Sequence, residues 1–286
     1  MRNVALIGYG EVGQIFARDL DAAGVNTSAF DILFDPRRPV CRPPARAAAD
    51  PASAVSTADL VISAVTANSA VAAAASVAPA IRPGTILLDI NSVSPATKRA
   101  GFDVVQAVGG RYVEAAVMAA VPPLGIGVPM LLGGPYARDA ARDLAALGFN
   151  VTHHSDEIGV ASAVKMCRSV VVKGLEALLA EALAAARRHG AERDVLDSLA
   201  ETFPGEDWNR LAAYMIGRAM EHGKRRGEEM REVARTVEEA GLSPDLCLAV
   251  ADRQDWTYAK GRGATPEGDL AAMLDALTRD MAKAER

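Results

Sequence analysis

Residues 3–13 read NVALIGYGEVG, an apolar run followed by three glycines in the spacing GxGxxG. The run is rich in β-branched and aliphatic residues and predicts a strand over 3–7. Apolar residues then recur at helical spacing and predict an amphipathic helix over 11–23. A strand, a glycine turn and a helix in immediate succession are typical of the first unit of a parallel α/β sheet.

The glycine motif predicts a dinucleotide-binding site. Its glycines permit a tight turn, the close approach of backbone to a pyrophosphate, and close packing of helix on strand. The N–H groups at the start of the helix would then face the phosphates, at the positive end of the helix dipole. The residues expected at the cofactor from this loop are Gly8, Tyr9, Gly10, Glu11, Val12 and Gly13.

Asp31 follows the predicted second strand, 26–30, and indicates which dinucleotide is preferred. A carboxylate at this place accepts hydrogen bonds from the adenosine ribose and repels a 2′-phosphate, which favours NAD over NADP. Arg37 and Arg38 follow shortly afterwards, and an arginine can neutralise a 2′-phosphate. NADP therefore stays open as the second cofactor.

The chain predicts two domains, at 1–155 and 156–286. The first alternates strands with helices, as expected for an α/β fold with a Rossmann-type, doubly wound parallel sheet. Its further strands are expected at 59–65, 85–90, 111–117 and 129–133.

The second domain, from residue 156, is predicted to be all-α. It should begin with a long interdomain helix over 157–188, capped by Ser155 or Asp156 and stopped by Gly190. The other helices are expected at 192–201, 206–222, 226–240, 243–255 and 266–284.

Composition narrows the class of protein. The formal net charge of −5 and the 5% aromatic residues give no footprint for nucleic acid or an anionic membrane surface. The three cysteines form no CxxC pair, which is typical of reduced thiols in the cytoplasm, and no group of residues has metal-ligand spacing. We therefore expect a cytoplasmic protein without metal, nucleic-acid or membrane partners.

Four further stretches, with the glycine loop, resemble the β-hydroxyacid dehydrogenase superfamily of 3-hydroxyisobutyrate and 6-phosphogluconate dehydrogenases. They are ADLVISAVTANSAV at 58–71, GTILLDINSVSP at 84–95, VEAAVMAAVPP at 113–123 and GVASAVKMCRS at 159–169. The resemblance implies that Val65, Thr66 and Asn91 lie at the cofactor and that Ser92 lies near the nicotinamide. It also implies that Lys165 is the catalytic lysine. It further implies a dimer or tetramer, of which we expect a homodimer through the helical domain.

The departures from the family pattern concern the substrate. Met118, Ala119 and Ala120 stand where the family has Ser-Gly-Gly, and Arg168 and Ser169 replace a pair of asparagines. Near the C-terminus the family's second lysine is missing, and basic residues including Arg225 and Arg226 stand one turn earlier. The resemblance is thus closest to a phosphogluconate-dehydrogenase-like subgroup with a divergent C-terminal domain, and these seven residues are the candidate substrate ligands besides Ser92.

The resemblance implies an NAD(P)-dependent dehydrogenase acting on a small anionic hydroxy acid or its oxo form. Oxidation of an alcohol needs a base for the hydroxyl proton, and a lysine serves when burial and nearby cations lower its pKa. A single lysine in a long helix is usually solvated, and only the family spacing favours Lys165 as that base. An imine reductase-like enzyme and a catalytically silent NAD(H)-binding protein remain the alternatives.

Overall fold

The computed structural model describes residues 1–34, 45–262 and 269–279. The chain forms two compact units, Met1–Met166 and Cys167–Arg286, which are described separately below. Helix α7, Val160–Arg188, runs from the first unit into the second. The two units therefore divide inside this helix, and the domain boundary expected at 155/156 stays a prediction.

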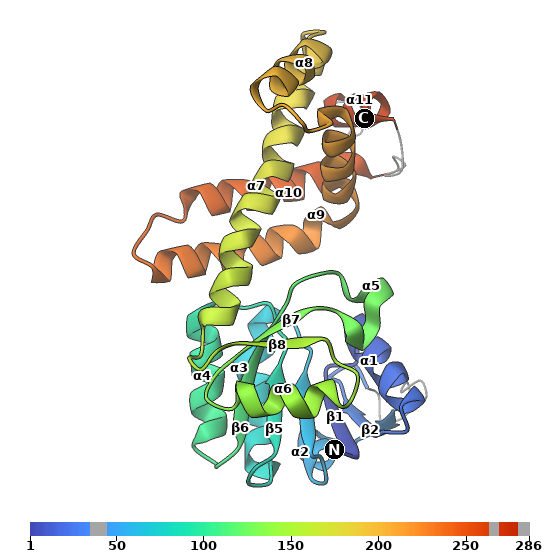
Figure 1. The fold of residues 1–286 in the computed structure, drawn as a ribbon. Coiled ribbons are helices and arrows are strands. Elements are labelled where there is room, and N and C mark those ends of the chain that lie inside the picture. Colours follow the sequence, from blue (N-terminus) through green and yellow to red (C-terminus); the bar gives the residue numbers. More distant parts are fainter. Residues whose placement is uncertain (35–44, 263–268, 280–286) are drawn as a thin grey trace, which may run out of the picture. The chain divides into compact units, whose positions relative to one another are not determined.

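The first unit is built on one mostly parallel sheet (Figure 1), which has eight strands among the described residues. The strand order is β3-β2-β1-β4-β5-β6-β7-β8, and its first six strands follow the doubly wound order. All neighbouring strands are parallel except β6 and β7, and the expected Rossmann-type, doubly wound parallel sheet is confirmed with this one antiparallel pair. The strands are β1 Asn3–Ile7, β2 Asn26–Phe30, β3 Arg46–Ala47, β4 Leu60–Ser63, β5 Ile86–Asp89, β6 Arg111–Val117, β7 Met130–Gly133 and β8 Val151–Ser155.

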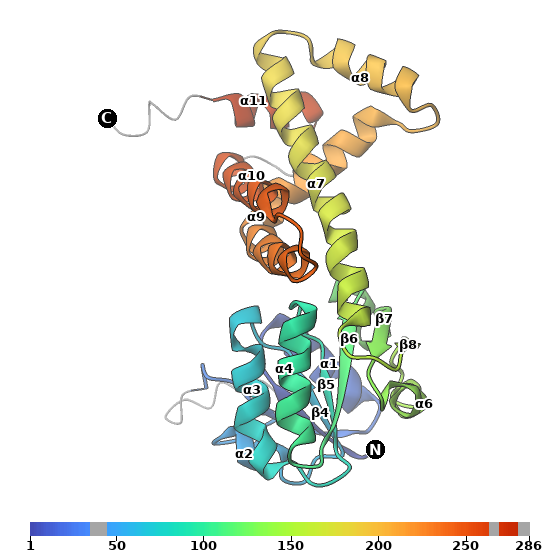
Figure 2. The same cartoon turned by 90° about the vertical axis from the view of Figure 1, so that its left-hand side faces the viewer.

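Helices cover both faces of the sheet (Figure 2). One face packs on α1 and α6 through Phe16, Leu20 and Leu144. The other packs on α2, α3 and α4 through Val55, Val77 and Val105. The helices and short 3₁₀ turns are α1 Glu11–Ala22, α2 Pro51–Val55, η1 Ala67–Ser69, α3 Ala70–Val77, η2 Ala78–Ala80, α4 Pro95–Gln106, α5 Val121–Leu124, η3 Gly125–Gly127 and α6 Ala137–Ala145.

Two glycines of the N-terminal motif are required by backbone packing. Gly8 has a φ of +94°, and a Cβ there would lie 2.2 Å from the Ala64 carbonyl oxygen. A Cβ on Gly13 would lie 2.3 Å from the Gly8 oxygen. Because neither residue has a Cβ, α1 can pack closely on β1 and β4, as the motif predicted.

A buried ion pair lies beneath the carboxyl end of β5. The Lys98 amine is 3.0 Å from Asp89 Oδ1 and donates to the Asp89 carbonyl at 2.8 Å. The Tyr112 hydroxyl donates to Asp89 Oδ2 at 2.6 Å. Burial, together with the Asp89 carboxylate, holds the pKa of the Tyr112 phenol well above its usual range.

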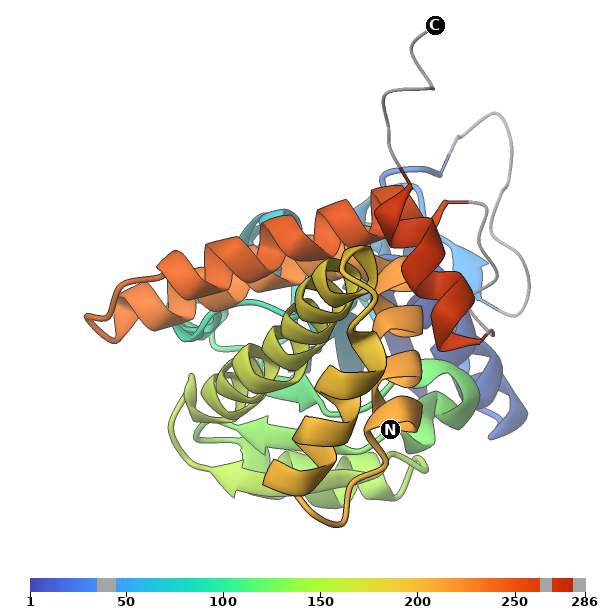
Figure 3. The ribbon, with the colours of Figure 1, turned by 90° about the horizontal axis from the view of Figure 1, so that it is seen from above.

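The second unit is helical throughout its described part (Figure 3). Besides the later turns of α7 it contains α8 Glu192–Thr202, α9 Trp208–Glu239, α10 Asp245–Gly261 and α11 Leu270–Thr278. Helices α9 and α10 lie side by side and are joined by a short turn. No helix in the described ranges has the length and hydropathy needed to cross a membrane.

The expectation of two helices at 206–222 and 226–240 is wrong, because α9 continues through both. Two glycines inside α9 serve helix packing. A Cβ on Gly223 would lie 2.3 Å from the Gln254 carbonyl oxygen, and one on Gly227 would lie 2.5 Å from Asp255 Oδ1. Small residues at these places let α9 and α10 approach closely.

We expect Lys98→Met to lower the free energy of unfolding by about 3–5 kcal/mol, because it leaves the buried Asp89 carboxylate without its counterion. Urea unfolding followed by circular dichroism measures the change. Arg142→Met is the matched control, since it breaks an exposed ion pair with Asp139 and should change stability by less than about 0.5 kcal/mol. Equal effects of the two substitutions would contradict a stabilising role for the buried pair.

Candidate functional site

The glycine loop presents the start of α1 to solvent. Gly10 is the N-cap, no side chain caps the helix, and nothing lies within 4 Å of the place where a Gly10 Cβ would be. Gly10 and Glu11 are exposed, Val12 is half-buried, and Tyr9 is buried. The loop thus leaves room for a diphosphate against the uncapped N–H groups of the helix, and it fits the expected dinucleotide.

Asp31 is fixed at the carboxyl end of β2 by backbone groups. Tyr9 N–H donates to its Oδ2 at 2.7 Å, and Leu33 N–H donates to its Oδ1 at 2.9 Å. Each oxygen keeps a second lone pair that can accept a hydrogen bond from a ribose hydroxyl. Arg37 and Arg38 lie outside the described residues.

Sequence reasoning missed two residues beside Asp31. Ile32 and Leu33 are 85% and 81% exposed. They form an apolar surface next to the carboxylate, which suits the face of a purine ring. The available signal was two adjacent aliphatic residues directly after Asp31, outside the predicted second strand.

Asn91 joins the ends of β4 and β5. Its Oδ1 accepts from Val65 N–H at 2.7 Å, and its Nδ2 donates to Ser63 Oγ at 2.9 Å. The side chain is therefore buried and occupied by protein groups, and it holds the loop that carries Val65. Thr66, next in that loop, is exposed.

Lys165 and Ser92 lie together at the carboxyl end of the sheet. The Lys165 amine donates to Ser92 Oγ at 2.6 Å, although the residues are 73 positions apart in the sequence. Both side chains are half-buried, and Ser92 follows directly on Asn91. Because the carboxyl ends of β1, β2, β4 and β5 share one edge, the pair lies on the edge that carries the glycine loop and Asp31.

The expectation that Ser155 or Asp156 caps the long helix is wrong. The helix begins at Val160, and Ser155 Oγ instead accepts from Glu157 N–H at 3.0 Å. The start of α7 is held from another strand, where Glu114 Oε1 accepts from Gly159 N–H at 2.8 Å and Ala161 N–H at 3.1 Å. A carboxylate supplied from β6 left no local sequence signal.

Met118, Ala119 and Ala120 follow β6 in the first unit. Met118 is half-buried, and its N–H donates to the Pro129 carbonyl at 2.9 Å. Ala119 and Ala120 are exposed, and Ala120 is the N-cap of the short helix α5. Since β5 and β6 are parallel neighbours, this segment emerges at the same edge as Ser92.

The remaining predicted residues belong to the second unit. Arg168 is exposed and Ser169 half-buried on α7. Arg225 is exposed on α9 and pairs with Glu229. Arg226, in contrast, is 4% exposed, and its guanidinium donates to both oxygens of Glu176, at 2.6 and 2.5 Å.

The partners of the buried cations in this unit were not foreseen. Lys173 lies 2.7 Å from Glu229, and its pKa is lowered by burial against the opposing effect of that carboxylate. Burial also lowers the pKa of Arg226, although Glu176 opposes the shift. Gln254 Nε2 donates to Glu176 Oε2 at 2.9 Å and to the Lys173 carbonyl at 3.4 Å, so these groups form one network.

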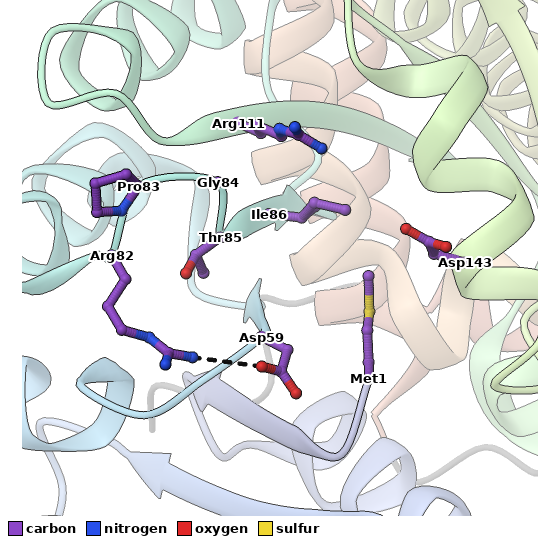
Figure 4. A pocket seen from close by; sticks show the side chains of 9 residues that line it. All are labelled: Met1, Asp59, Arg82, Pro83, Gly84, Thr85, Ile86, Arg111 and Asp143. Carbon is purple, nitrogen blue, oxygen red and sulfur yellow. Dashed lines mark hydrogen bonds and ion pairs between the residues drawn. The ribbon is translucent and has the colours of Figure 1, made fainter.

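A hollow of about 400 Å³ lies at the opposite end of the strands (Figure 4), beside the amino ends of β1, β4, β5 and β6. Arg82 points across it to Asp59, and the two are 3.3 Å apart. Ligands of open α/β sheets bind at the carboxyl ends of the strands, so this hollow is not the predicted site. Among the described residues no group of His, Cys, Asp and Glu could hold a metal ion.

Two protein families match the chain. Residues 3–153 match the NAD binding domain of 6-phosphogluconate dehydrogenase. Residues 186–257 match a domain of unknown function, DUF1932. The second match agrees with a C-terminal domain of a separate type.

Three known proteins illustrate the similarity. The 3-hydroxyisobutyrate dehydrogenase of Pseudomonas aeruginosa is 26% identical over 97% of this chain and 92% of its own. The NAD-dependent L-serine dehydrogenase of the same organism is 27% identical over 73% of this chain and 72% of its own. The crystal structure of a conserved hypothetical protein from Sinorhizobium meliloti superposes with a TM-score of 0.84 at 37% identity, covering 98% of this chain and 96% of that protein.

The glycine loop, the doubly wound sheet and these matches agree along the whole chain. The chain belongs to the β-hydroxyacid dehydrogenase superfamily, with the NAD-binding domain of 6-phosphogluconate dehydrogenase, and is a dehydrogenase-like NAD(P)-dependent oxidoreductase.

Proposed function

We propose that the protein moves a hydride between nicotinamide and a small anionic hydroxy acid or its oxo form, with Lys165 as general acid and base. The observation that carries the proposal is the 2.6 Å contact between the Lys165 amine and Ser92 Oγ at the carboxyl edge of the sheet. A base must lie within hydrogen-bond reach of the proton that it accepts. A ligand hydroxyl that replaced or joined Ser92 Oγ at this amine would meet that condition.

The cofactor, when bound, supplies the hydride acceptor or donor. The chain's own residues do the remaining work. In the oxidising direction Lys165 accepts the hydroxyl proton at Nζ, and in the reducing direction it returns a proton to the carbonyl oxygen. Ser92 orients the substrate hydroxyl, because its Oγ both accepts and donates hydrogen bonds.

The first unit fits NAD in three places. The uncapped start of α1 beside Gly10 suits the diphosphate. The Asp31 carboxylate suits the ribose hydroxyls, and Ile32 and Leu33 suit the adenine. The fixed carboxylate is our reason for proposing NAD rather than NADP.

The substrate class follows from the relatives and from the departures in sequence. L-serine and 3-hydroxyisobutyrate, which give two relatives their names, each carry a hydroxyl on the carbon β to a carboxylate. We propose such a β-hydroxy acid, with its carboxylate held by the backbone of Ala119 and Ala120 beyond Met118. Arg168, Ser169 and Arg225 are proposed as further ligands. Arg226 is the weakest candidate, because an anion would compete with Glu176 for it.

A homodimer through the helical unit is proposed from the surface of α7. Val171 and Leu178 are 70% and 66% exposed. They stand seven positions apart and so share one face of the helix. An apolar stripe of this kind is typical of a helix that packs against a partner.

An imine reductase-like enzyme and a silent NAD(H)-binding protein would each need a different use of Lys165. Assays with NAD⁺ and a panel of β-hydroxy acids, including L-serine and 3-hydroxyisobutyrate, separate the three. We expect NADH formation with at least one member. Activity confined to cyclic imines with NADPH would favour the imine reductase, and tight NADH binding without any turnover would favour the silent protein.

Lys165→Ala should lower kcat at least about 100-fold, because general acid and base catalysis typically contributes that much. NADH titrations followed by protein fluorescence should show unchanged affinity, since the glycine loop and Asp31 are untouched. Lys224→Ala, which removes an exposed lysine of α9, is the control and should keep full turnover. Near-normal turnover of Lys165→Ala would refute the assignment.

Asp31 should determine the choice of cofactor. The unmodified protein should bind NAD⁺ at least about tenfold more tightly than NADP⁺, because like charges placed together cost several kcal/mol. Asp31→Ser should narrow that ratio, whereas Asp21→Ser, at an exposed position of α1, should leave it unchanged. Calorimetric titration with both cofactors measures the ratio, and equal affinities in the unmodified protein would contradict the proposal.

A further inference from the structure

Glu114 is a fully buried carboxylate in the middle of β6. Its exposed fraction is 0%, and its Oε1 accepts two backbone N–H groups at the start of α7, those of Gly159 and Ala161. Its Oε2 is buried and has no hydrogen-bond partner among the described residues. The Glu114 side chain thus makes both of its hydrogen bonds to the start of α7 through a single oxygen.

The surrounding backbone is shaped to admit this carboxylate. Gly133 is the register partner of Glu114 on β7, and a Cβ there would lie 2.3 Å from Glu114 Oε1. Gly159, which donates to it, has a φ of +102°. Glycines at both places let the strand side chain reach the helix start.

The charge of Glu114 also suits that place. The first turn of α7 contains no acidic residue. A helix N-terminus carries a partial positive charge and four N–H groups without intrahelical partners. Glu114 therefore supplies from another strand what a capping side chain supplies locally.

Helix α7 carries Lys165 in its second turn, six residues after Gly159. The Ser162 hydroxyl donates to the Gly159 carbonyl at 3.0 Å, and Ala163 N–H donates to the same oxygen at 2.9 Å. The turns between the capped residue and Lys165 are thereby continuous. The position of Gly159 consequently sets the position of the Lys165 side chain.

The partner of Lys165 is held from the neighbouring strand. Asp89 on β5 is the register partner of Glu114, and its Oδ1 accepts from Asn91 N–H at 2.8 Å, immediately before Ser92. Two adjacent buried carboxylates therefore hold the two ends of the Lys165–Ser92 contact, Asp89 the serine end and Glu114 the lysine end.

We propose that Glu114 is a positioning residue that fixes the first turn of α7, so that the Lys165 amine meets Ser92 Oγ. The proposal rests on the proposed function only for the statement that the contact between Lys165 and Ser92 serves catalysis. It concerns where Lys165 is held and needs no knowledge of the substrate. It can therefore be tested without turnover.

The test measures how fast acetic anhydride acetylates Lys165 in the folded protein. The protein is then digested, and mass spectrometry compares the acetylation of Lys165 with that of the exposed Lys224 in the same sample. In Glu114→Ala the rate at Lys165 should rise about fivefold, which corresponds to the typical loss of one helix cap. Glu114→Gln should restore the slow rate, because its amide oxygen can still accept both N–H groups. Glu157→Ala, in the exposed turn before α7, should change nothing.

A second variant tests the proposal if Glu114→Ala does not fold. Gly133→Ala keeps the carboxylate but pushes a Cβ against Oε1, and it should also accelerate acetylation of Lys165.

Combining Glu114→Ala with Ser92→Ala tests whether Glu114 acts through the contact between Lys165 and Ser92. Ser92→Ala alone should accelerate acetylation, and adding Glu114→Ala should then have little further effect, because residues acting on one contact are not additive.

An unchanged Lys165 rate in Glu114→Ala or Gly133→Ala would overturn the proposal. A full additional increase in the Ser92→Ala background, or equal acceleration at Lys224, would also overturn it, since each indicates general loosening of the fold. Failure of the proposed function has a different signature: normal turnover of Lys165→Ala while the acetylation results hold.

Discussion

Two carboxylates buried side by side impose the main constraint on the carboxyl end of the sheet. Asp89 and Glu114 are register partners on β5 and β6, and neither has access to solvent that would stabilise its charge. Asp89 is neutralised by the equally buried Lys98 and by the Tyr112 hydroxyl. Glu114 is stabilised by the start of α7. Because buried charges need such partners, α4 and the first turn of α7 have little freedom to shift relative to these strands.

The first half of the fold follows from the sequence because its signals are local. An apolar strand, the GxGxxG turn and an amphipathic helix lie within the first 23 residues, and the alternation that follows predicts the doubly wound sheet. The antiparallel β7 carries no such signal, since strand direction depends on a connection and not on composition. The break expected inside α9 failed because Gly223 and Gly227 are packing positions against α10, which only the three-dimensional structure reveals.

The site divides in the same way. The glycine loop and Asp31 carry a local signal, because the residues expected at the cofactor lie close together in the sequence. The residues that hold Lys165 and Ser92 in place carry no local signal. Glu114, for example, accepts a hydrogen bond from Gly159 N–H, which lies 45 positions later in the sequence. Arg226 shows the converse limit: its charge suggests an anion ligand, but Glu176 on another helix already pairs with it.

In the proposed mechanism, Lys165 exchanges the proton of the substrate hydroxyl at the nicotinamide. A crystal structure with NADH and 3-hydroxyisobutyrate tests this most directly, because it gives the distances from the Lys165 amine to the hydroxyl and from nicotinamide C4 to the carbon that bears it. We predict that the amine lies within hydrogen-bond reach, about 3 Å, of a hydroxyl that also contacts Ser92. A hydroxy acid bound at C4 with Lys165 turned away, and another side chain at its hydroxyl, would contradict this role of Lys165.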